Sequence, residues 1–183
     1  MPLVFVDIKV QGLEAATGRA RRNSRTDPMD EKTLSNLTLS SWAATVWSKE
    51  LRGVPLQPQE ASLAWCMRQH NDWRPFWNSL GSHEAENQRG TNILVHIYND
   101  ASVKLQLDSK NPPQIFDLFQ SLRGKGFPDI DALHALAYVM QEQSWNAKNA
   151  GASFDTTQYV ERAKQYVENV IVHPEILRSL RLP

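Results

Sequence analysis

The sequence has a single cysteine, Cys66, in its 183 residues. A lone cysteine excludes an intrachain disulfide framework and any metal site built from several cysteines. The chain also lacks an apolar run close to the ~20 residues that a membrane-spanning helix needs. No signal segment is expected at its start, because Asp7 and Lys9 interrupt the apolar stretch Leu3–Val10. We therefore expect a cytoplasmic protein in a reducing compartment.

The chain also has no excess of positive or negative charge, because 20 basic residues balance 20 acidic ones. This balance argues against binding nucleic acid or a membrane with the whole surface, although it allows a local basic patch. Hydrophobic residues make up 41% and charged residues 22% of the chain, which is typical of a globular domain. The sequence contains no GxSxG motif, no Walker loop and no GxGxxG motif. No reaction is therefore indicated, and whether the protein is an enzyme stays open.

The first 32 residues differ in composition from the rest of the chain. Leu3–Val10 alternates in part between apolar and polar residues, which predicts a short strand. A single strand has no sheet of its own, so it must pair elsewhere in the chain, pair with another chain or stay loose. Residues 11–32 are polar, and four arginines fall close together in them: Arg19, Arg21, Arg22 and Arg25. We interpret residues 1–32 as a strand followed by a flexible basic arm.

From about Thr33 onward the apolar residues recur at helical spacing. Proline and glycine divide this part of the chain into six to eight predicted helices. Short polar side chains that suit helix N-caps precede several of them: Asp72, Asp129, and Asp155 or Thr156. The pattern predicts an all-α fold, with residues 33–183 forming one multi-helix bundle.

Two of the predicted helices carry histidine and acidic residues in or beside their apolar stripes. His96 and Asp100 are four residues apart and so share one face of their helix. Asp131, His134 and Glu142 lie along about three turns of another helix. Helix bundles build metal sites from such inward-facing side chains. The candidate ligands of a zinc, iron or manganese ion are therefore His96, Asp100, His134 and Glu142, with Asp131 orienting one of them from outside.

A metal-free interpretation of these residues is simpler. A histidine on an apolar helix face is more often a hydrogen-bonded core residue than a ligand. His96 and His134 could bond to Asp131, Asp100 or Tyr98 with no ion present, and the spacings HxxxD and DxxH often occur by chance. From the sequence alone we expect no cofactor in preference to a divalent transition metal. To share an ion, the ring nitrogens of His96 and His134 must approach within about 4 Å.

Cys66 and His70 form another pair four residues apart, which would suit a thiol activated by an imidazole. The thiol, however, lies on the predicted apolar stripe of its helix, together with Leu63, Met67 and His70. We therefore interpret Cys66 as a buried apolar residue.

The order of features from about Leu39 to Tyr166 resembles a family of small bacterial helical proteins that is described only as a conserved domain of unknown function. The resemblance rests on the shared order and spacing of four stretches: Leu39–Glu60, Thr91–His96, Gln106–Pro113 and Asp131–Trp145. It implies an all-helical fold in which two long helices hold HxxxH and HExxH-like pairs. Such pairs imply a metal ion or a polar core network.

Carried over residue by residue, the resemblance is incomplete. His96, His134, Glu142 and Trp145 match the family pattern, whereas Asp100 stands where a second histidine is expected. The first histidine and the glutamate of the other pair are replaced by Ile130 and Asp131. The resemblance therefore implies the fold more strongly than it implies an activity.

Three functions are compatible with the sequence. The first is a helical interaction module that docks on a larger protein assembly by adding its N-terminal strand to a partner's sheet. The second is a metal-assisted hydrolase or redox protein that uses the candidate ligands. The third is nucleic-acid binding through Arg19–Arg25. The first is preferred because the predicted strand has no partner within the chain, so we expect a protein partner and no membrane.

Overall fold

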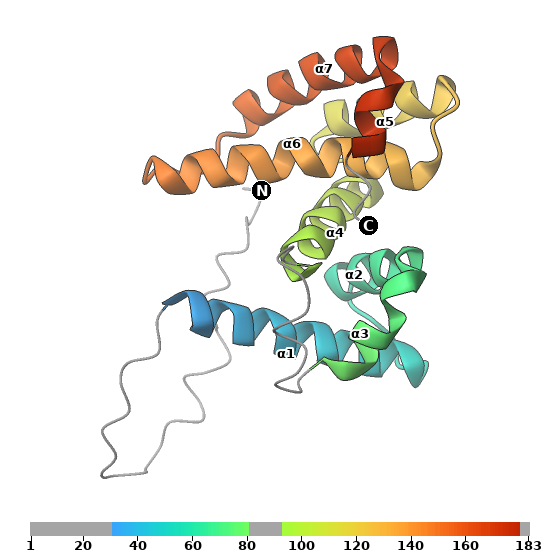
Figure 1. Ribbon diagram of the computed structural model, residues 1–183, viewed down its shortest axis with the longest axis vertical. Coiled ribbons are helices and arrows are strands. Elements are labelled where there is room, and N and C mark those ends of the chain that lie inside the picture. Colours follow the sequence, from blue (N-terminus) through green and yellow to red (C-terminus); the bar gives the residue numbers. More distant parts are fainter. Residues whose placement is uncertain (1–30, 81–92, 180–183) are drawn as a thin grey trace.

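The computed structural model of the protein describes residues 31–80 and 93–179 (Figure 1). Within these ranges the chain forms helices and no strand, which confirms the predicted all-α class. The predicted strand Leu3–Val10 and the arginines of the basic arm lie outside the described residues, so docking and nucleic-acid binding through residues 1–32 stay predictions. None of the described helices is both long enough and apolar enough to cross a bilayer.

Seven α-helices and two 3₁₀ segments follow one another in the described ranges. Their bounds are α1 (Glu31–Leu51), α2 (Pro58–Gln69), η1 (Asn71–Trp73), α3 (Arg74–Ser79), α4 (Ile93–Ser109), α5 (Pro113–Gly124), α6 (Asp129–Asn149), α7 (Thr156–Val172) and η3 (Pro174–Ser179). Figure 1 shows α4 at the centre, with α1, α2 and α3 on one side of it and α5, α6 and α7 on the other. Helix α4 contacts both α2 and α6, so three helices from separate parts of the sequence meet in the middle of the protein.

The hydrophobic core joins these three central helices. Fully or almost fully buried side chains come from each of them: Leu63 and Met67 from α2, Ile97 and Val103 from α4, and Leu133, Leu136 and Met140 from α6. Burying one such side chain contributes roughly 1.5–3 kcal/mol. Cys66 belongs to the same core and has no exposed surface, as the apolar interpretation of its thiol predicts.

Of the predicted N-cap positions, Asp155 is confirmed, whereas Asp72 and Asp129 are not N-caps. Asp155 caps α7, because its carboxylate accepts hydrogen bonds from the backbone N–H groups of Thr157 and Gln158 at 2.8 and 3.1 Å. The prediction for Asp72 is wrong: this residue lies inside η1, where the Trp73 N–H donates to the His70 carbonyl at 3.0 Å and delays the start of α3.

The predicted cap at Asp129 is also displaced, by one residue. Pro128 occupies the N-cap of α6, and its carbonyl accepts the Ala132 N–H at 3.0 Å. Asp129 is therefore the first residue of the helix, where its negative charge interacts favourably with the helix dipole.

The cap at Asp155 gives a test of the fold. We expect Asp155→Ala to lower the free energy of unfolding by about 1 kcal/mol, because two backbone N–H groups lose their acceptor. The change is measured from urea midpoints at an unchanged m-value. Asp117→Ala, at an exposed position inside α5, is the control and should stay within about 0.5 kcal/mol of the parent. Equal losses in the two variants would show that the cap adds no stability.

Candidate metal centre

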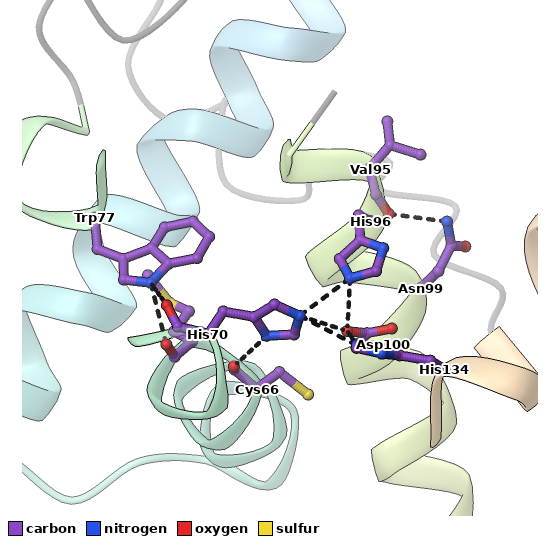
Figure 2. Close-up of polar contacts among 9 residues, drawn as sticks. Cys66, His70, Trp77, Val95, His96, Asn99, Asp100 and His134 are labelled. Atoms are coloured by element: carbon purple, nitrogen blue, oxygen red, sulfur yellow. Dashed lines mark hydrogen bonds and ion pairs between the residues drawn. The ribbon is translucent and has the colours of Figure 1, made fainter. Parts of the chain in front are cut away.

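Three histidines and one aspartate bring their side chains together between α2, α4 and α6 (Figure 2). His70 is the C-cap residue of α2, His96 and Asp100 are one turn apart on α4, and His134 lies on α6. Their donor atoms all lie within 4.8 Å of one another. His70 is 26 residues from His96 and 64 from His134, so the tertiary fold assembles this cluster.

Five of the six distances between donor atoms of the cluster are 3.1–3.5 Å, and the donor atoms of the sixth pair, His96 and His134, lie within 4.8 Å of each other. Nε2 of His70 lies 3.1 Å from Nε2 of His96 and 3.2 Å from Nε2 of His134. Oδ2 of Asp100 lies 3.2 Å from Nε2 of His96 and of His134, and 3.5 Å from Nε2 of His70. A tetrahedron with edges of about 3.3 Å has its centre about 2.0 Å from each corner, which is the usual distance between zinc and a histidine nitrogen.

Asp100 is the most deeply buried member of the cluster, with a side chain that has no exposed surface. Burial raises the pKa of its carboxyl group, but the contacts with His134 and His96 outweigh burial and lower the pKa to about 2. The group is therefore ionised at neutral pH. Nε2 of His96 and of His134 lies 3.2 Å from Oδ2, close enough to bond to the carboxylate where these rings carry a proton there. With neutral rings that present a lone pair instead, neither carboxylate oxygen has a hydrogen-bond donor among the described residues. An ionised carboxylate in this position is costly unless a cation pairs with it.

The neighbours of His70 determine which of its ring nitrogens carries hydrogen. Nδ1 lies 2.9 Å from the carbonyl oxygen of Cys66. A carbonyl only accepts, so Nδ1 carries the hydrogen and Nε2 of the neutral ring keeps its lone pair. Burial lowers the pKa of His70 despite the opposing effects of the Cys66 carbonyl and Asp100, which favours the neutral ring. This tautomer, with one nitrogen bonded to a carbonyl, is the one that metal-ligating histidines adopt.

Two tryptophans hold His70 in place beyond the end of α2. The indole Nε1 of Trp77 donates to the carbonyl oxygens of Met67 and His70 at 3.1 and 3.3 Å, which fixes the backbone at this turn (Figure 2). The ring of Trp73 stacks on the His70 ring, with 4.7 Å between centroids, and meets the His96 ring edge-on at 5.5 Å. The imidazole of His70 is therefore positioned from both its backbone and its ring face.

Comparison with known protein families assigns the chain to a family. Residues 38–165 match a family described as a domain of unknown function (DUF1841), and all four clustered residues fall inside that match. The chain belongs to the DUF1841 family. This assignment confirms the resemblance to an uncharacterised family, whereas the bacterial origin and the HxxxH and HExxH-like pairs stay predictions. Comparisons with curated proteins and with solved structures found no match.

Three of the four candidate ligands in this DUF1841 domain come together, and Glu142 does not join them. The donor atoms of His96, Asp100 and His134 meet in the cluster, and the rings of His96 and His134 lie 5.0 Å apart between centroids. Glu142 instead interacts with Arg162 of α7, at 3.2 and 3.5 Å. The eight residues that separate it from His134 correspond to about 12 Å along the helix, which is too far for one ion.

The sequence analysis did not identify His70 as a candidate ligand. The available signal was its place four residues after Cys66, at the end of an apolar stripe, and this was weighed only as a sign of thiol chemistry. Asp131, the predicted orienting residue, is half-buried on the first turn of α6, three residues before His134. Its orienting role stays a prediction.

Proposed function

We propose that this DUF1841 domain binds one divalent transition metal ion, with zinc as the best fit. The ligands would be Nε2 of His70, His96 and His134 and one carboxylate oxygen of Asp100. The observation that carries the proposal is the 3.1–3.5 Å spacing of five of the six donor pairs, around a buried carboxylate that accepts no hydrogen bond of regular geometry from the described residues. Zinc accepts histidine nitrogens and carboxylate oxygens as ligands and commonly takes four of them in a tetrahedron. One ion would hold α2, α4 and α6 together.

A network of hydrogen bonds explains the cluster less well than an ion does. Nε2 of His70 has a single lone pair and can accept one hydrogen, yet three polar atoms lie within 3.5 Å of it. One of those atoms is Oδ2 of Asp100, which is negatively charged and repels a lone pair. A cation at the centre would interact favourably with all four donors at once. For this reason we favour a bound metal over the metal-free network that the sequence alone suggests.

The kinds of donor select the class of metal. Calcium and magnesium prefer oxygen ligands, and the cluster offers three imidazole nitrogens with one carboxylate. Imidazole suits zinc, copper, iron and nickel, and a compact tetrahedral arrangement of nitrogen and oxygen favours zinc among them.

Elemental analysis tests the proposal directly. Protein purified without an affinity tag or a chelator should contain close to one transition metal ion per chain. In His70→Ala the ratio should fall well below one, because the ion loses one of four ligands. Glu142→Gln is the matched control: it removes a carboxylate from α6 that interacts with Arg162, so we expect it to keep the parental ratio. A ratio far below one in the parent protein, even after incubation with zinc, would reject the proposal.

A further inference from the structure

A pocket of about 420 Å³ lies where the C-terminal ends of α1 and α2 meet η1 and the start of α3. Figure 1 shows these elements on one side of α4. The volume falls within the roughly 300–1,000 Å³ that is common for small-molecule sites. None of the four clustered residues lines this pocket, so it is separate from the proposed metal centre.

The floor of the pocket is apolar and is formed by Trp47, Leu51 and Met67. Trp47 and Met67 are 7 and 0% exposed, whereas Leu51 is 56% exposed. The indole Nε1 of Trp47 donates to the side-chain oxygen of Asn78 at 2.9 Å, so the ring is held in place. Methionine adapts to irregular shapes. A hydrocarbon body in the pocket would cover the exposed surface of Leu51, which is favourable.

The rim of the pocket carries more positive than negative charge. Arg68 and Arg74 line it together with a single acid, Glu50, which pairs with Arg68. The side chains of Arg74 and Asn71 make no ion pair or hydrogen bond with any residue that the structure describes. A guanidinium group offers a planar set of N–H donors that matches a carboxylate, and the amide of Asn71 offers further donors. The rim therefore suits an anion.

We propose that this pocket binds a small aliphatic carboxylic acid as its anion. The carboxylate would bond to Arg74 and Asn71, and the hydrocarbon chain would lie against the apolar floor. One negative charge balances the net charge of the lining, which is about +1 with two arginines and one glutamate. A phosphate ester carries more charge and would be repelled more strongly by Glu50.

Isothermal titration calorimetry of the full chain with octanoate tests the pocket. We expect saturable binding of one octanoate per chain. Octanol has the same body without the charge, and acetate has the charge without the body, so each should bind about tenfold or more weakly. Burying about two methylene groups, or forming one hydrogen bond to a charged group, produces a difference of this size. Octanol binding as tightly as octanoate would overturn the role of the rim, and octyl phosphate binding more tightly would overturn the choice of a carboxylate.

Two arginine variants distinguish the pocket from a general effect of charge. Arg74→Gln should weaken octanoate binding roughly tenfold, because the carboxylate loses its charged partner. Arg52→Gln is the matched control, because Arg52 is exposed, does not line the pocket and donates from Nε to the Ser48 carbonyl at 3.1 Å. It removes the same charge from the same region and should change the affinity by less than about twofold. Equal losses in the two variants would overturn the assignment to this pocket.

Glu50→Gln provides a gain of affinity that a damaged fold cannot imitate. Glu50 pairs with Arg68, and its negative charge opposes a carboxylate at the rim. Its removal should strengthen octanoate binding several-fold. Unchanged or weaker binding in this variant, or no saturable binding of octanoate to the parent protein, would overturn the proposal. None of these measurements requires a bound metal, so their outcome is independent of the proposed function.

Discussion

Adding zinc to the metal-free protein should raise its melting temperature by roughly 5–10 °C. The four proposed ligands come from three helices and meet only in the folded chain, so the ion stabilises the native state selectively. At a free zinc concentration 100 times the dissociation constant, this stabilisation is about 2.7 kcal/mol. For a domain of this size, each kcal/mol shifts the melting temperature by roughly 2–4 °C. The measurement is a thermal scan in the presence of a chelator and then with zinc in excess.

Two histidine variants test whether zinc stabilises the protein through the proposed ligands. His70→Ala removes a proposed ligand and should lose nearly all of the shift. His173→Ala is the matched control, because His173 is the exposed C-cap residue of α7, faces Glu175 and is not part of the cluster. Equal shifts in the two variants would show that zinc acts elsewhere on the protein.

The parts of the fold that the sequence predicts correctly are those set by local interactions. The helical period of the apolar residues and the interruptions by proline and glycine depend on neighbours within a few residues, so they indicate the helices directly. The predicted N-cap at Asp155 is correct for the same reason, since its carboxylate accepts hydrogen bonds from N–H groups two and three residues ahead. Asp72 is not a cap because a 3₁₀ turn, closed by His70 and Trp73, precedes the helix.

The composition of the candidate site is harder to predict because it depends on positions along facing helices. Spacing on one helix indicates which side chains share a face, and it brings His96 and Asp100 together correctly. It does not indicate which turn of α6 lies opposite that pair. The structure places His134 there and Glu142 about two turns beyond.

His70 illustrates a second limit. It follows the last residue of α2, so the periodicity of that helix no longer describes its direction. Its place depends on contacts with Trp73 and Trp77, which belong to the next two elements. A histidine at the end of an apolar stripe is therefore a candidate ligand whose partners only the tertiary contacts show.

Asp100→Asn should have opposite effects on the metal-free and the zinc-bound protein. The amide keeps the shape of the side chain and removes a buried negative charge that accepts no hydrogen bond of regular geometry from the described residues. Without metal, we expect the free energy of unfolding to stay the same or to rise, because the cost of burying the charge disappears. With zinc, the loss of a ligand should reduce affinity by more than the roughly 10–100-fold that the loss of a second-sphere partner costs. Urea titrations with a chelator and with excess zinc measure both effects.

The metal-free half of this experiment also distinguishes the ion from a hydrogen-bonded network. If protons on the histidines hold Asp100 in place, the substitution breaks a buried ion pair and should cost about 3–5 kcal/mol even with a chelator present. Asp108→Asn is the matched control on α4, because that carboxylate is exposed and pairs with Lys104 at the surface. It should change neither titration by more than about 0.5 kcal/mol. A large loss of stability confined to metal-free Asp100→Asn would therefore favour the network and reject the ion.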